Sequence, residues 1–151
     1  MKLTLSHTIA AGRERLFDAL TDPSVLQRCI PGCESLVESG PDAYEATLRI
    51  GVAGLKGTYT GKAAITNKQR PNTLTLSFEG KGGPGFVRGS AVINLTSESG
   101  GTHVASEADV QVGGLIAAIG SRLIEAASKK MGADFFDRLA IEITERREGT
   151  V

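Results

Sequence analysis

Apolar and polar residues alternate along most of the chain from residue 2 to about residue 112, and this period of two is typical of half-buried β-strands. The first such segment, Lys2 to Ile9, places Leu3, Leu5 and His7 on one face and polar side chains on the other. We therefore expect an N-terminal strand with one apolar and one wet side. A histidine on the apolar face either anchors a ligand or is satisfied inside the core, and the second outcome is the commoner one.

The pattern becomes helical after this strand. From Gly12 to Leu20 the apolar residues recur at spacings of three and four, and Asp22-Pro23 ends the segment because the residue before a proline avoids helical conformation. A second short helix is predicted from Ser24 to Arg28, with Asp22 or Ser24 as its cap. The sequence thus predicts two small helices directly after the first strand.

Alternation returns after Pro31-Gly32 and is interrupted by four turn sequences, which predict hairpins. These turns are Ser39 to Asp42, Arg70 to Asn72, Gly80 to Gly85 and Ser97 to Gly101. The apolar faces of the predicted strands are Tyr44, Ala46, Leu48 and Ile50; Leu55, Tyr59, Ala63 and Ile65; Leu74, Leu76 and Phe78; Ala91, Ile93 and Leu95; and Val104, Ser106, Ala108, Val110 and Val112.

Gly113-Gly114 ends the last strand, and a long amphipathic helix is predicted from there to about Glu145. A sheet with one apolar face is stable only when that face is covered, and this helix is the one element long enough to cover it. We expect a single α+β domain over residues 1–151, with a seven-stranded antiparallel curved sheet wrapped around the C-terminal helix. The predicted apolar stripe of the helix is Ile116, Ile119, Leu123, Ala127, Met131, Phe135 and Leu139.

Three ordered segments carry a family resemblance, namely Cys29 to Glu34, Gly51 to Gly61 and Asp109 to Arg122. On these segments the chain resembles the START-like helix-grip superfamily of polyketide cyclases and lipid transporters, and within it the family of the carbon monoxide dehydrogenase G subunit. The resemblance covers nearly the whole chain. It implies an apolar cavity between sheet and helix, no shared catalytic constellation, and an accessory role beside molybdenum hydroxylases in membrane recruitment and quinone or lipid handling.

The net charge of the chain and the length of its apolar segments limit the classes of partner that it can bind. The chain has 17 basic and 17 acidic residues, so the long-range attraction that drives non-specific nucleic-acid binding is missing, and we expect no nucleic-acid partner. No apolar run reaches the roughly 20 residues that span a bilayer, and the N-terminus lacks the apolar core of a signal peptide. We expect a cytoplasmic protein that contacts the inner face of the membrane transiently at most.

Metal and catalytic chemistry find little support in the sequence. The two cysteines, Cys29 and Cys33, are separated by only three residues, and the two histidines, His7 and His103, stand in unrelated segments, so the four ligands of a structural zinc site are missing. The glycine-rich segment from Gly80 to Gly85 contains a proline and precedes no helix, so it is a hairpin tip rather than a phosphate loop. We predict no metal, no catalytic residues and no cofactor, apart from an isoprenoid quinone or lipid carried as cargo.

Small residues on the inward faces, including Ala63, Ala91 and Ala108, leave volume unfilled, and apolar cavities of this kind bind apolar ligands. The alternative is a packed core in which Phe78, Phe86, Phe135 and Phe136 close the gap. Ligand-binding side chains are predicted along the inward faces, the second short helix and the first turns after the last strand. They are Leu26, Ile30, Pro31, Leu48, Ile50, Leu55, Tyr59, Phe78, Ala91, Ile93, Val110, Ile116, Ile119 and Leu123.

Three functional hypotheses follow from these observations. The leading one is a non-enzymatic protein that binds a hydrophobic small molecule, a quinone or lipid, and serves a molybdenum hydroxylase of the carbon monoxide dehydrogenase type at the membrane. The second is a cyclase or hydrolase that acts on a hydrophobic small molecule. The third is an interaction subunit with a filled core.

Overall fold

The computed structural model describes residues 1–52 and 54–149, with the backbone alone for residues 145–149. The chain forms one seven-stranded antiparallel sheet with two short helices after the first strand and a long helix after the last. This architecture confirms the α+β prediction. The elements are β1 (Lys2–Ile9), α1 (Arg13–Leu20), α2 (Pro23–Cys29), β2 (Cys33–Gly40), β3 (Ala43–Ile50), β4 (Gly57–Gln69), β5 (Thr73–Gly82), β6 (Gly85–Glu98), β7 (Gly101–Gly113), α3 (Leu115–Ala118) and α4 (Ser121–Gly149).

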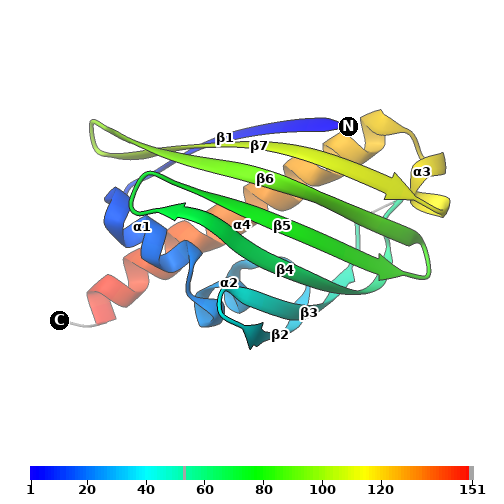
Figure 1. Ribbon diagram of the computed structural model, residues 1–151. Coiled ribbons are helices and arrows are strands. Elements are labelled where there is room, and N and C mark those ends of the chain that lie inside the picture. The colour runs from blue at the N-terminus through cyan, green and yellow to red at the C-terminus, as the bar shows by residue number, and fades with distance from the viewer. Residues whose placement is uncertain (53, 150–151) are drawn as a thin grey trace.

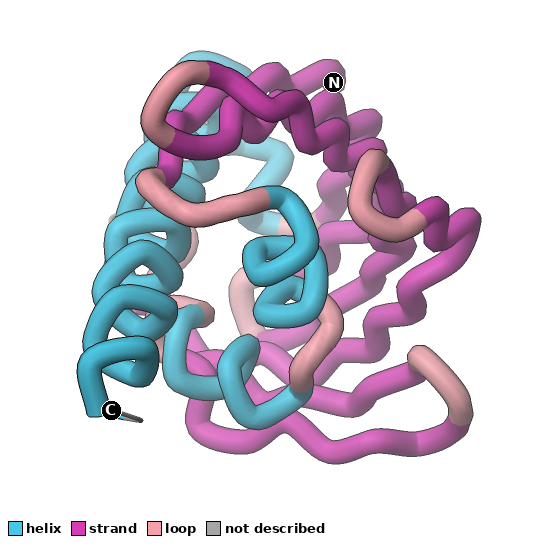
Figure 2. Tube along the Cα trace, turned by 90° about the vertical axis from the view of Figure 1, so that its left-hand side faces the viewer, coloured by secondary structure: helices cyan, strands magenta, loops and turns pink. Residues whose placement is uncertain are grey.

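The sheet has the strand order β1-β7-β6-β5-β4-β3-β2, so the first strand of the chain pairs with the last. Lys2 lies opposite Asp109 and Ile9 opposite Thr102 in this pairing. Figure 1 shows α1, α2 and α4 together behind the sheet, and Figure 2 shows the sheet bending around them. The predicted hairpin turns are confirmed, because each of the four segments joins two consecutive antiparallel strands.

The start of α2 follows the capping expected from its sequence. The Asp22 carboxylate accepts a hydrogen bond from the Ser24 backbone N–H at 3.0 Å and another from its hydroxyl at 2.8 Å. Pro23 occupies the first turn, where its missing N–H costs nothing. Asp22 is therefore the cap of α2, and the acceptor that it supplies fixes the sharp turn between the two short helices.

Glycines inside the strands allow the sheet to bend. A Cβ atom added at Gly89 would lie 2.2 Å from the Asp109 carbonyl oxygen, and one at Gly61 would lie 2.5 Å from the Glu79 carbonyl oxygen. Neighbouring backbones approach more closely there than a side chain permits, as is usual where a strand bends. These two glycines are consequently required by the curvature of the sheet, in addition to leaving space on its inward face.

Buried apolar residues of the described part of the chain form two separate clusters. The larger, here the α1/α2 cluster, joins the short helices and the far half of α4 to one end of the sheet and includes Leu16, Phe17, Leu20, Val25, Tyr44, Leu74, Leu95, Val104, Phe136, Leu139 and Ile143. The smaller, here the α3 cluster, lies at the opposite end and consists of Leu55, Tyr59, Ile116, Ile124 and Ala127. The hydrophobic core is thus divided into two parts, one at each end of the sheet.

The prediction of one unbroken C-terminal helix from Ile116 is wrong. Gly120 adopts a φ of +91°, a conformation that L side chains rarely accept, and it separates the four-residue α3 from α4. This break changes the phase of the helix. Leu123, predicted to face inward, is 59% exposed, and Ile124 takes the buried position instead at 4%.

Candidate ligand-binding site

A row of half-buried residues crosses the inward face of the sheet between the two clusters. Each comes from a different strand and points to the same side as the buried residues of that strand, yet each keeps contact with solvent and belongs to neither cluster. This row is called the middle band here. It consists of Leu3 (β1), Ala46 (β3), Ala63 (β4), Phe78 (β5), Ala91 (β6) and Ala108 (β7).

Strand pairing brings the small members of the middle band together. Ala91 pairs with Ala108, which in turn pairs with Leu3. Phe78 pairs with Ala63 on one side and with a glycine of β6 on the other. The floor of the site is therefore apolar and is made largely of residues with small side chains. Side chains this small occupy little of the space between the sheet and α4.

The helix side of the site is also only half-buried at this level. Met131 and Gly132, in the middle of α4, both keep solvent contact, whereas Ala127 before them and Phe136 after them are buried. A Cβ atom at Gly132 would lie 2.6 Å from Leu5 Cδ1, so α4 comes close to the sheet at β1. The closest approach of α4 to the sheet described here is therefore at its β1 edge.

Besides the buried Thr102 at the start of β7, two polar side chains share this apolar face. Ser106 lies on β7 between Val104 and Ala108, and His7 lies on β1 against the Phe136 ring, with ring centroids 4.4 Å apart. His7 Nε2 is buried and has no hydrogen-bond partner among the described residues. Burial lowers the pKa of His7, an effect that a nearby aspartate of α4 partly opposes. Burial consequently favours the neutral form of the imidazole.

The tyrosine hydroxyl that could orient a polar headgroup is already engaged. Tyr59 donates a hydrogen bond of 2.7 Å to the Leu55 carbonyl oxygen within the α3 cluster. Burial raises its pKa and that of Tyr44, which is 3% exposed in the α1/α2 cluster. Both phenols therefore remain neutral donors, and the Tyr59 hydroxyl is committed to the local backbone.

The structure spreads the predicted ligand-binding residues over three environments, and their role in binding stays a prediction. Leu123 is exposed and lies outside any interior site. Buried residues among them are Leu55, Tyr59, Val110 and Ile116. Half-buried residues are Leu26, Ile30, Pro31, Leu48, Ile50, Phe78, Ala91, Ile93 and Ile119.

The middle band adds four residues that the predicted set omitted, and the strand alternation could have identified them. These residues lie on the inward face beside larger neighbours, and only their partial exposure distinguishes them from the buried residues of the same strands. They are Leu3, Ala46, Ala63 and Ala108. Of the four phenylalanines that could close the gap, Phe86 does not contribute. It is 41% exposed, lies over Gly113 and has the Arg88 guanidinium 5.7 Å from its ring centroid.

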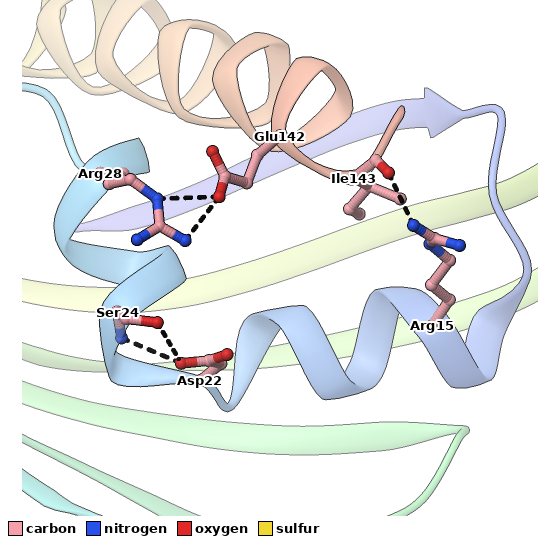
Figure 3. A network of polar contacts seen from close by, with 6 residues as sticks. All are labelled: Arg15, Asp22, Ser24, Arg28, Glu142 and Ile143. Carbon is pink, nitrogen blue, oxygen red and sulfur yellow. Dashed lines mark hydrogen bonds and ion pairs between the residues drawn. The ribbon is translucent and has the colours of Figure 1, made fainter. Parts of the chain in front are cut away.

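Polar contacts tie the α1/α2 end of the site together (Figure 3). Arg28 on α2 donates from Nε to the Glu142 carboxylate of α4 at 2.8 Å. Arg15 on α1 donates to the Ile143 carbonyl oxygen at 2.7 Å. Both short helices are thus fixed to α4, which closes this end.

The opposite face of the sheet carries grooves of a different character. Two of them are lined by residues of β2 to β7, with Lys62, Glu79 and Arg88 common to both. Glu45 pairs with Lys62, Lys62 with Glu79, and Glu79 with Arg88 across successive strands. Because the charges alternate in sign, these four residues offer no net charge to a charged ligand, while the exposed Val37 and Phe86 add apolar surface to one groove.

Reactive side chains do not gather in the part of the chain that the structure describes. Burial raises the pKa values of Cys29 and Cys33, which disfavours their thiolates. Among the side chains that the structure describes, in residues 1–52 and 54–144, no group of three or more His, Cys, Asp or Glu could hold a metal ion. His103 meets Ser6 on the exposed face of the sheet, away from His7. The apolar interior is therefore the chemical feature that needs an explanation.

Comparison with protein families finds a match over residues 6–144 to the family described as the G subunit of carbon monoxide dehydrogenase (CoxG). The chain belongs to the CoxG family. The match spans both short helices, the whole sheet from β2 to β7 and most of α4, so it includes nearly every element that surrounds the middle band.

Solved structures share the fold. A conserved protein from Geobacillus kaustophilus is 36% identical, with a TM-score of 0.93 and 96% of each chain covered. A protein from Rhizobium leguminosarum (15% identity, TM-score 0.74, 96% and 95% covered) and protein Ms6760 from Mycobacterium smegmatis (15%, TM-score 0.73, 96% and 92%) share the fold. Comparison with curated proteins finds no match.

Within the described residues of this CoxG family member, no helix combines the length and the apolar character needed to cross a bilayer.

Proposed function

We propose that this chain is a non-enzymatic accessory protein that holds an apolar ligand, a quinone or a lipid, between its sheet and α4. In this role it serves a molybdenum hydroxylase of the carbon monoxide dehydrogenase type. The ligand lies over the middle band, with its apolar body against the alanines. The observation that carries the proposal is that this row of inward-facing side chains stays half-buried between two fully buried clusters.

Half-burial has a direct physical meaning at these positions. A side chain that faces a covering helix and still contacts solvent lies beside a space that protein atoms do not fill. An apolar wall next to such a space gains dispersion contacts when an apolar molecule occupies it. Ala63, Ala91 and Ala108 supply that wall, while Ser106 is a hydroxyl within it that can bond a carbonyl or hydroxyl of the ligand.

Family membership supports the second half of the proposal. The family takes its name from a subunit of carbon monoxide dehydrogenase, and a subunit without a gathered set of reactive side chains in its described residues suits a supporting role better than a catalytic one. The ligand would then be a molecule that the hydroxylase exchanges with its surroundings. An isoprenoid quinone meets this requirement, because it combines an apolar tail with carbonyl oxygens and accepts electrons.

Mass spectrometry of an organic extract tests ligand binding directly. The protein is purified without detergent, and a mock purification provides the lipid background. Ala91→Trp places a large side chain on the middle band, and Val92→Trp places the same side chain on the opposite, exposed face of the same strand. We expect a stoichiometric quinone or lipid in the wild-type protein and in Val92→Trp, and a loss of it in Ala91→Trp.

An empty wild-type protein that stays empty after incubation with quinone-containing vesicles would overturn the carrier. Equal ligand content in the two tryptophan variants would overturn the assignment of the site. Because a tryptophan in the interior also threatens folding, Ala91→Leu serves as a milder variant, and circular dichroism confirms the fold of each. Co-purification of a molybdenum hydroxylase with the tagged protein tests the partner separately.

A further inference from the structure

The face of the sheet that is turned away from the helices carries a continuous row of exposed residues. Figure 1 views the molecule from this side, with α1, α2 and α4 behind the sheet. Successive register pairs connect the members of the row from β2 to β7. All are exposed, and the set is called the outer row here: Val37 (β2), Glu45 (β3), Lys62 (β4), Glu79 (β5), Arg88 (β6) and Gln111 (β7).

The charged members of the outer row make no ion pair with any side chain that the structure describes, although opposite charges are neighbours along the row. On the same face of β3, by contrast, Arg49 Nε lies 3.0 Å from Glu34 Oε1. Arg88 Nε donates instead to the neutral side chain of Gln111, at 2.8 Å. The charges of the outer row are therefore available to a partner outside the chain.

The charges along the outer row are complementary to the same row read in reverse. From β3 to β6 their signs are negative, positive, negative and positive. Consider a two-fold axis that runs parallel to the strands, above the boundary between β4 and β5. It sets the outward face of a second copy against this one and reverses the order of its strands. Lys62 then lies opposite Glu79 of the second copy, and Glu45 lies opposite Arg88 of the second copy. Each of these contacts occurs twice, because a two-fold interface uses the same surface on both copies.

We propose that the outward face of the sheet is a self-association surface, through which two copies of this chain form a dimer with the outer row at its centre. A second copy fits better than a partner with one sign of charge, since such a partner is repelled by half of the charged residues in the row. The alternation also selects the orientation. A two-fold axis along the row would place Glu45 opposite Glu45 and every other charge opposite its own kind.

The charged side chains are long enough to make these contacts. Lys62, Glu79 and Arg88 stand between the two grooves of this face, which have smaller side chains such as Thr60 and Ser77 in their linings. Stacked sheets cross at about 30°, and β3 and β6 lie ~7 Å from the axis, so the outer contacts are displaced by ~4 Å along the strands. Glutamate and arginine side chains can span a displacement of this size.

Exposed apolar side chains near the ends of the outer row add to the contact. Val37 is 62% exposed on β2, and Phe86 is 41% exposed on β6. In the proposed orientation β6 faces β3 of the second copy, so Phe86 lies next to the strand that carries Val37 of the second copy. Burial of apolar surface at both ends stabilises the dimer. The two interiors face away from each other, so the inference goes beyond the proposed function and does not depend on it.

Sedimentation equilibrium of the full chain tests the proposal, and we expect a species of twice the 15.8 kDa mass of one chain. Glu45→Arg and Arg88→Glu each place like charges opposite one another at two contacts in the dimer. Because juxtaposed like charges oppose association strongly, each variant alone should raise the dimer Kd at least about tenfold. Glu125→Arg and Arg122→Glu make the same changes at exposed positions of α4 and should leave the Kd unchanged.

Mixing the two outer-row variants separates a broken contact from a folding defect. In a mixed dimer the substituted position of one chain faces the substituted position of the other, arginine against glutamate, and the second contact keeps its natural pair. Equimolar Glu45→Arg and Arg88→Glu proteins should therefore associate with each other about as tightly as the wild-type protein does. Two misfolded proteins would not regain association on mixing, and circular dichroism checks the fold of each.

The proposal is overturned if the wild-type protein stays monomeric at every concentration measured. It is also overturned if the α4 variants weaken the dimer as much as the outer-row variants do, or if the mixture fails to associate. A monomeric wild-type protein whose association with a molybdenum hydroxylase is lost in Glu45→Arg would assign this face to that partner instead. Ligand content, measured on the same samples, should be unchanged in all four variants, so failure of the dimer leaves the ligand proposal standing.

Discussion

Arg28 and Glu142 join the second short helix to the long C-terminal helix, with Arg28 Nε 2.8 Å from Glu142 Oε1. They are separated by 114 positions in the chain, and their contact closes the α1/α2 end of the site. The ion pair also raises the pKa of Arg28, with the hydrogen bond to Glu142 as its largest cause. The carboxylate is mostly buried, with 18% of its side chain exposed, whereas the Arg28 side chain is 40% exposed.

The coupling between Arg28 and Glu142 can be measured by a double-mutant cycle. We expect Arg28→Ala and Glu142→Ala each to lower the free energy of unfolding, and the coupling energy to be about 0.5–1 kcal/mol, because one partner is well exposed to solvent. Urea unfolding of the four proteins gives the value. A coupling energy of zero would show that the contact contributes nothing in solution.

Acid should destabilise the protein through His7. Burial lowers its pKa in the folded state from an ordinary value near 6.5, so the unfolded chain takes up the proton at a higher pH than the folded one. The contribution of neutral His7 is complete above the unfolded pKa and is lost as the pH falls below about 6.5 toward the lowered folded pKa. His7→Leu should therefore flatten the fall in unfolding free energy as the pH drops below about 6.5.

The control for this measurement is His103→Leu, which removes the other histidine, on the exposed face of the sheet. We expect this variant to keep the acid dependence of the wild-type protein in urea unfolding. If His103→Leu and His7→Leu change the pH profile equally, His7 is not the group responsible.

Gly89 should not tolerate a side chain. Gly89→Ala places a Cβ atom 2.2 Å from the Asp109 carbonyl oxygen, so the strands must separate, and we expect a loss of about 2 kcal/mol in unfolding free energy. Gly51→Ala is the matched control, because a Cβ atom there meets nothing within 4 Å. Its effect should stay within ~0.5 kcal/mol. Thermal unfolding of both variants shows whether the loss at Gly89 comes from the clash with β7 or from the general effect of replacing a glycine.

The phase of α4 can be tested with two leucines. Leu139 is completely buried in the α1/α2 cluster, so Leu139→Ala should cost about 2–5 kcal/mol. Leu123→Ala should change the free energy of unfolding by less than ~0.5 kcal/mol, since its side chain is 59% exposed. A large loss of unfolding free energy in Leu123→Ala would show that Leu123 faces inward, as the apolar periodicity predicted.

Period-two alternation sufficed to predict the sheet, because each inward strand face is continuous and each turn carries glycine or proline. It could not predict the break at Gly120. The apolar spacing from Ile116 to Leu139 is close to helical, and a single glycine inside such a pattern is compatible with both an unbroken helix and a stop. That ambiguity placed Leu123 on the wrong face.

The candidate site was harder to predict than the fold. Alternation assigns Ala63, Ala91 and Ala108 to the inward face, but it contains no information on whether α4 reaches them. That depends on how closely the helix approaches the sheet, which is set at Gly132 and Leu5 by residues near opposite ends of the sequence.

The pairing of β1 with β7 has a consequence for the synthesis of the protein. Lys2 finds its partner only when Asp109 has left the ribosome, so the N-terminal strand waits while the five intervening strands and both short helices are translated. Such non-local closure is slow compared with the formation of local hairpins. The nascent chain therefore carries β1 without its partner for most of translation, and the meander of β2 to β6 can form before the strand that was made first joins the sheet.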